Sequence, residues 1–97
     1  MDIKDVAVIN PSLNERRLIA TIATNLNIKV HDFTAFLKGY DNLYPHVIYG
    51  FEFHMICGVR IPGNRKEISV TDFCDLLIKT FKKSESDNLF EELENII

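Results

Sequence analysis

Two thiols and three imidazoles are the side chains of this sequence that could support catalysis or metal binding. Cys57 and Cys74 lie far apart, without the CxxC spacing of a redox dithiol or the pattern of a zinc site. His54 precedes Cys57 by three residues, and residues three apart on a strand point to opposite faces, so the two should not form a nucleophile and its base. The remaining histidines, His31 and His46, add no metal-ligand spacing. We therefore expect reduced thiols, no cofactor, no metal and no enzyme activity, and a weak monothiol redox role for Cys57 is the third-ranked alternative.

A basic loop offers a different chemistry. Arg60, Arg65 and Lys66 surround the turn residues Pro62, Gly63 and Asn64, just before a helix that begins near residue 69. Cationic side chains beside a helix N-terminus can hold phosphate or carboxylate, because free backbone amides point the same way. A small phosphorylated or nucleotide ligand is therefore the alternative to a protein partner. The loop could also be an ordinary solvent-exposed turn that binds no ligand.

Aromatic side chains are concentrated between residues 40 and 53. Tyr40, Tyr44 and Phe51 lie next to turn residues, where exposed aromatic side chains commonly anchor a partner. Tyr49 and Phe53 are assigned to the core. This stretch is our first candidate for a binding surface.

The first elements that must position these residues are a strand, a helix and a strand. Residues 5–9 form an apolar run typical of a buried strand, and residues 28–33 alternate as a second strand. Ser12 and Glu15 have the spacing of a capping box and predict the start of the helix between them. A strand–helix–strand unit favours parallel pairing of its two strands. The face of the helix expected to be buried holds Leu18, Ile19, Ile22, Ala23 and Leu26, and the exposed face holds Arg16, Arg17, Thr21, Thr24 and Asn25.

The second half predicts a hairpin followed by a helix. Residues 35–37 are compatible with a short helix ended by Gly39, and Pro45 opens a hairpin with strands at 46–49 and 53–58. Ser69 or Thr71 should cap the last well-marked helix. The buried stripe expected for that helix is Val70, Phe73, Cys74, Leu77 and Phe81.

Charge divides the chain into two parts. The net charge is −3, and residues 84–97 hold five acids and no base, which leaves about +2 on residues 1–83. We expect one domain over residues 1–83 and an acidic amphipathic helix or tail over 84–97 that packs on the body or joins copies into a homo-oligomer. The charge and the lack of a long apolar run argue against direct nucleic-acid binding and against the membrane, and the acidic start of the chain predicts a cytoplasmic protein.

The order β-α-β-(short α)-β-β-α, Pro45 and Gly58 together resemble thioredoxins, in the form found in glutaredoxins. The resemblance covers roughly residues 4–82 and implies an α/β fold with a mixed four-stranded sheet. It also implies that Pro45 matches the family's cis-proline, with the backbone of Tyr44 available to an extended peptide. Where the family carries CxxC or CxxS, residues 10–14 read Asn-Pro-Ser-Leu-Asn, so dithiol chemistry is not expected.

These observations predict a non-catalytic protein-binding protein on a degenerate thioredoxin-like scaffold. Its size, acidic balance and lack of motifs also resemble small accessory proteins of tailed phages, some of which act as inhibitors of a host or defence component. The candidate ligand- or partner-binding residues are Ser12, Tyr40, Tyr44, Pro45, His46, Phe51, Arg60, Arg65 and Lys66.

Overall fold

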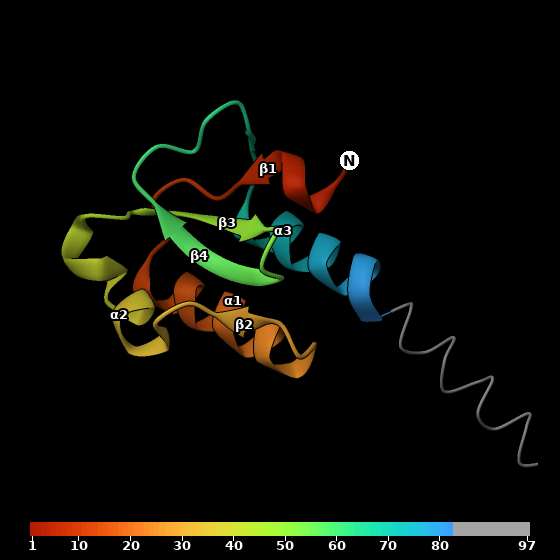
Figure 1. The fold of residues 1–97 in the computed structure, drawn as a ribbon, viewed down its shortest axis with the longest axis horizontal. Helices are drawn as coiled ribbons and strands as arrows, with labels where there is room; N and C mark the ends of the chain where they lie inside the picture. The colour runs from red at the N-terminus through yellow and green to blue at the C-terminus, as the bar shows by residue number, and fades with distance from the viewer. Residues whose placement is uncertain (83–97) are drawn as a thin grey trace, which may run out of the picture.

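The protein is a mixed α/β domain. The structure, a computed structural model, describes residues 1–82 (Figure 1). In chain order its elements are η1 (Ile3–Asp5), β1 (Val6–Ala7), α1 (Leu13–Asn25), β2 (Lys29–Val30), α2 (Phe33–Leu37), η2 (Gly39–Asn42), β3 (His46–Gly50), β4 (Met55–Val59), β5 (Lys66–Glu67), α3 (Val70–Leu77) and the π-helical turn η3 (Ile78–Lys82).

The strands form two ladders joined by one bridge. In the larger ladder β4 lies between β2, which runs parallel to it, and β3, which runs antiparallel to it. In the smaller ladder β1 and β5 are parallel. Val8, just after β1, exchanges two backbone hydrogen bonds of 2.9 Å with Val47 of β3, which joins the two ladders edge to edge.

The expected parallel pairing of the first two strands is wrong. A strand has only two hydrogen-bonding edges, and those of the β1 segment are used by β5 on one side and by Val47 on the other. β2 instead takes the free edge of β4, where Lys29 lies opposite Met55 and Val30 lies opposite Ile56. The described strands therefore do not form the predicted four-stranded sheet with β1 and β2 as neighbours.

Several turns also differ from the prediction. The Tyr44–Pro45 peptide bond is trans, because no cis bond occurs among the described residues. The chain reaches β3 instead through left-handed backbone at Gly39–Asn42. The second hairpin strand begins at Met55 rather than at 53, since His54 adopts a left-handed turn conformation, and Phe53 is exposed rather than in the core.

The core lies between the larger ladder and two helices. In β3, Val47 and Tyr49 are buried while their neighbours are half-buried, so one face of the hairpin carries the core. The helices α1 and α3 contact each other and cover this face (Figure 1). The largest fully buried side chains are Phe36, Phe73, Ile19, Ile56, Leu77, Val6 and Val47.

Both predicted helix starts are confirmed. Ser12 and Glu15 form the capping box of α1, and the Ser69 hydroxyl accepts a hydrogen bond from the Asp72 amide at the start of α3. The buried face of α1 is rotated from the expected one, because Arg16 is buried and Leu18 is exposed. The stripe of α3 is buried at Val70, Phe73, Cys74 and Leu77, as expected, and Phe81 is half-buried.

The predicted amphipathic helix at 84–97 lies outside the described residues. Within residues 1–82, no helix combines the length and the apolar character needed to cross a bilayer.

Candidate binding clefts

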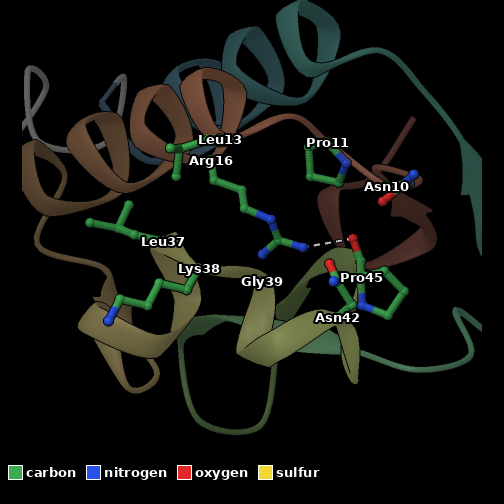
Figure 2. Close-up of a pocket in the computed structure, with 9 residues that line it drawn as sticks. All are labelled: Asn10, Pro11, Leu13, Arg16, Leu37, Lys38, Gly39, Asn42 and Pro45. Carbon is green, nitrogen blue, oxygen red and sulfur yellow. Dashed lines mark hydrogen bonds between the residues drawn. The ribbon is translucent and has the colours of Figure 1, made fainter.

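Arg16 is the only charged residue in the buried core of the described chain, with 3% of its surface exposed. Its place on the first turns of α1 is fixed by the capping box at Ser12. From there the side chain extends to the segment between α2 and β3 (Figure 2). Nη1 donates to the carbonyl oxygen of Phe36 at 3.0 Å, and Nη2 donates to that of Pro45 at 2.7 Å and, more weakly, to that of Tyr44 at 3.4 Å. The guanidinium thus ties α1 to both ends of the α2–β3 connection.

Four consecutive residues of this connection have left-handed backbone. The φ angles are +70° at Gly39, +50° at Tyr40, +58° at Asp41 and +67° at Asn42. Left-handed backbone is rare for residues other than glycine and persists where surrounding contacts hold it.

Three contacts hold this turn in place. The guanidinium of Arg16 lies beneath Gly39, where an added Cβ would be 3.6 Å from it. The Tyr40 hydroxyl donates to the carbonyl oxygen of His31 at 2.6 Å. The Tyr40 ring covers Gly58 so closely that a Cβ there would lie 2.5 Å from Cε2. The turn is therefore a packed part of the fold.

A cleft of about 290 Å³ opens above Arg16, between the start of α1 and this turn (Figure 2). We call it the Arg16 cleft, and it is lined by Asn10, Pro11, Leu13, Arg16, Leu37, Lys38, Gly39, Asn42 and Pro45. Among its apolar lining residues Leu13 is 48% exposed, and the exposed apolar residues Leu43 (64%) and Tyr44 (44%) follow the lining residue Asn42 in the chain. The cleft therefore combines cationic and apolar lining side chains.

The charge of Arg16 has no carboxylate partner in the described chain. The one salt bridge among residues 1–82 joins Lys4 to Asp2, and the acceptors of Arg16 are neutral carbonyls. Burial lowers the pKa of Arg16 by desolvation, with Tyr40 acting in the opposite direction. A buried charge is usually compensated by an opposite charge. Since Lys38 also lines the cleft, the two positive charges of the cleft favour binding of an anion.

A second cleft, of about 400 Å³, lies at the turn between β3 and β4. We call it the hairpin-tip cleft, and it is lined by Lys4, Asp5, Gly50, Phe51, Glu52, Phe53 and Arg65. Phe51 and Phe53 are 69% and 72% exposed. Nζ of Lys4 lies 5.6 Å from the centre of the Phe51 ring, and Arg65 donates to the carbonyl oxygen of Val6 at 3.3 Å.

The structure places the predicted site residues in separate regions. Pro45 lines the Arg16 cleft, and Tyr40 and Tyr44 pack beside it with their ring centres 5.4 Å apart. His46 is next to them, where its Nδ1 accepts a hydrogen bond from the Asn10 amide at 3.1 Å. Ser12 is adjacent in sequence to two lining residues, but its hydroxyl serves the cap of α1.

The other predicted residues do not join this group. Phe51 and Arg65 line the hairpin-tip cleft, while Arg60 and Lys66 are exposed elsewhere on the loop and on β5. The three cations of the loop therefore do not converge on the start of α3. That helix start already has the Ser69 cap and carries Asp72 in its first turn, which disfavours a bound anion there.

Cys57 and the histidines do not form a reactive pair. Burial raises the pKa of the Cys57 thiol, opposed in part by Arg65, so little thiolate is present near neutrality. Nδ1 of His54 is hydrogen-bonded to the hydroxyl of Tyr49 at 2.5 Å. No group of three or more His, Cys, Asp or Glu side chains within residues 1–82 is arranged to hold a metal ion.

Arg16 and the left-handed turn are the features that the sequence reasoning missed. A signal for Arg16 was present, because Arg16, Ile19, Ala20 and Ala23 follow the i, i+3, i+4, i+7 spacing of one helix face and all are buried. No comparable signal exists for Tyr40 and Asp41, whose left-handed backbone is set by tertiary contacts.

Comparisons of the chain with known protein families, with curated proteins and with solved structures find no match.

Proposed function

We propose that this is a non-catalytic binding protein whose Arg16 cleft receives an acidic segment of a partner protein. A carboxylate of the partner enters the cleft toward Arg16 and Lys38. Apolar side chains of the same segment contact Leu13 in the cleft, together with the exposed Leu43 and Tyr44 that follow the lining residue Asn42. The observation that carries the proposal is the buried guanidinium of Arg16, which lies at the floor of an open cleft with only neutral acceptors.

The make-up of the cleft supports a protein segment as ligand. Binding surfaces concentrate energy in a few residues, among which tyrosine and arginine are enriched, and both occur here. The turn that forms one wall is held by the Arg16 and Tyr40 contacts, so little ordering has to accompany binding. An accessory or inhibitory protein of the phage type would act through such a surface.

The thioredoxin-like origin stays a prediction from element order and from Pro45. The proposed binding function does not depend on a thioredoxin-like origin. β1 and β2 are not neighbours in the structure, and the Arg16 cleft is formed by the start of α1 and the α2–β3 connection. A phosphorylated ligand at the basic loop is not favoured, because Arg60, Arg65 and Lys66 do not converge. A redox role of Cys57 is not favoured either, because burial raises the pKa of that thiol.

The proposal can be tested by NMR titration with two short capped peptides, Leu-Glu-Leu and Leu-Gln-Leu, which differ only in the carboxylate. We expect the glutamate peptide to shift the amide signals of Gly39 and Asn42 and to bind about tenfold more tightly than the glutamine peptide. The substitution Lys38→Ala should weaken the glutamate peptide several-fold. Lys79→Ala is the matched control, because it removes the same charge from η3 at the other end of the sheet (Figure 1).

Equal affinity for the two peptides would contradict the proposal. So would signals that shift only at the hairpin tip, or an equal effect of Lys38→Ala and Lys79→Ala. Arg16 itself is not used as the test residue, since its removal would also disturb the fold.

A further inference from the structure

The hairpin-tip cleft is an exposed apolar feature that the proposed function does not use. Phe51 and Phe53 come from the turn between β3 and β4 and are about seven-tenths exposed. Large apolar side chains gathered at one exposed site commonly mark a contact surface. The charges around them balance, because Lys4 and Arg65 are accompanied by Asp5 and Glu52. Apolar contact is therefore the main attraction that this cleft offers.

Phe81, close to the end of the described residues, packs on the hairpin beside the residues that line this cleft. The Phe81 ring centre is 5.0 Å from that of His54 and 5.2 Å from that of Tyr49. His54 directly follows Phe53, so the chain continues past η3 from a point next to the hairpin tip. The Arg16 cleft is lined by Pro45, the residue before β3, and β3 begins at the opposite end of the hairpin from its turn (Figure 1).

The sequence beyond residue 82 has the composition that such a cleft would accept. Its apolar residues are Leu89, Phe90, Leu93, Ile96 and Ile97. An extended chain spans roughly 3.3 Å per residue, so residues 82–89 can cover about 25 Å. This reach is longer than the hairpin turn from Phe51 to His54, which is only three residue steps along the chain. The segment 84–97 carries five acids against a charge of about +2 on residues 1–83, so the two parts also attract each other at longer range.

We propose that residues 84–97 of the same chain dock in the hairpin-tip cleft, with apolar side chains on Phe51 and Phe53. This site is separate from the Arg16 cleft, and the inference does not rest on the proposed function. Docking covers apolar surface that would otherwise be open to unwanted association, and a partner that binds the cleft must displace the segment.

A tryptophan reporter in the full chain tests the docking. The sequence contains no tryptophan, so Phe53→Trp provides a single fluorophore at an exposed position. We expect Leu89→Ser together with Leu93→Ser to increase acrylamide quenching of the reporter by about twofold and to shift its emission to longer wavelength, because the cover is removed. Ser84→Ala with Ser86→Ala is the matched control and should leave both readings unchanged.

A second reporter locates the contact. Leu43→Trp places a fluorophore at an exposed position next to Asn42, which lines the Arg16 cleft, and the same segment substitutions should not affect it. Analytical ultracentrifugation at the concentrations used should give the mass of one chain, 11.2 kDa.

Three outcomes would overturn the inference. The first is quenching at position 53 that does not respond to the segment substitutions. The second is a response at position 43 instead, which would place the segment in the Arg16 cleft. The third is protection that rises with protein concentration together with a doubled mass, which would make the segment of a second copy the occupant.

Discussion

Arg16 shows how one side chain can serve both the fold and a binding site. Its two Nη atoms donate to the carbonyl oxygens of Phe36 and Pro45, backbone groups at the two ends of the α2–β3 connection. The same guanidinium places a positive charge at the floor of a cleft. Since no carboxylate of residues 1–82 neutralises it, the charge is available to a ligand at the cost of some stability.

Replacing Arg16 should therefore weaken the whole fold. We expect Arg16→Ala to lower the free energy of unfolding by about 2–4 kcal/mol, because buried carbonyls lose their donors and a cavity is left. The neighbouring Arg17 is exposed, and Arg17→Ala should change the value by no more than about 0.5 kcal/mol. Urea unfolding followed by circular dichroism measures both. Equal effects of the two substitutions would show that the Arg16 hydrogen bonds do not support the fold.

At the scale of elements, the hairpin and the turn η2 are locked by one close contact. Gly58 of β4 faces Tyr40, and a Cβ on Gly58 would lie 2.5 Å from the ring and 2.9 Å from the carbonyl oxygen of Tyr44. Gly50, on the paired strand β3, has its nearest neighbour atom at 3.5 Å from such a Cβ. The two glycines of one hairpin therefore form a natural pair for comparison.

We expect Gly58→Ala to destabilise the protein by about 1–3 kcal/mol, because the added methyl group must displace packed atoms. Gly50→Ala should cost clearly less. Thermal unfolding of the two variants provides the measurement, and loss of the Tyr40 contact should appear as a changed NMR signal of that ring only in Gly58→Ala. A Gly50→Ala variant that is as unstable as Gly58→Ala would refute the role of the Tyr40 contact.

The helix starts and the apolar stripe of α3 could be predicted from the sequence, but the pairing of the strands could not. The capping box at Ser12, the cap at Ser69 and the apolar stripe of α3 depend on residues within a few positions of each other, so the sequence pattern contains them. The pairing of β1 with β5 joins residues about sixty positions apart and depends on the path of the loop after β4. The thioredoxin-like pairing of β1 with β2 was inferred from element order alone, and element order does not decide which strand edge is free.

The candidate site was also predicted only in part, because closeness in sequence does not show which residues meet in the folded protein. The sequence predicts Pro45, Tyr44 and Tyr40 as binding residues near a turn, and the structure places Pro45 in the lining of the Arg16 cleft with the two tyrosines packed against each other beside it. Phe51 is close to them in sequence and Arg65 belongs to the basic loop, but both line the hairpin-tip cleft, which the length of the hairpin separates from the Arg16 cleft. Arg16 was assigned to solvent because a charged residue is seldom fully buried, although its helical spacing from Ile19 favoured the core.

At the scale of the whole molecule, two small ladders share a single core. Val6 and Val8 from the β1 segment belong to the same apolar cluster as Val47, Ile56 and residues of both long helices. Among residues 1–82, a single isolated bridge, between Val8 and Val47, connects the ladders by backbone hydrogen bonds. Side-chain packing must therefore couple them, since two hydrogen bonds contribute roughly 1–3 kcal/mol in total.

This arrangement predicts that residues 1–82 unfold in one cooperative transition. Urea unfolding followed by far-ultraviolet circular dichroism should coincide with unfolding followed by tyrosine fluorescence, because Tyr49 is buried in the shared core. Phe73→Ala removes a fully buried ring of α3 and should lower both midpoints equally, with a loss of about 3–5 kcal/mol. Thr71→Ala, at an exposed position of the same helix, is the control and should move neither midpoint appreciably. If the two probes separated, or if Phe73→Ala shifted only one of them, the ladders would be independent units, and the clefts at the two ends of the sheet would belong to parts that fold apart.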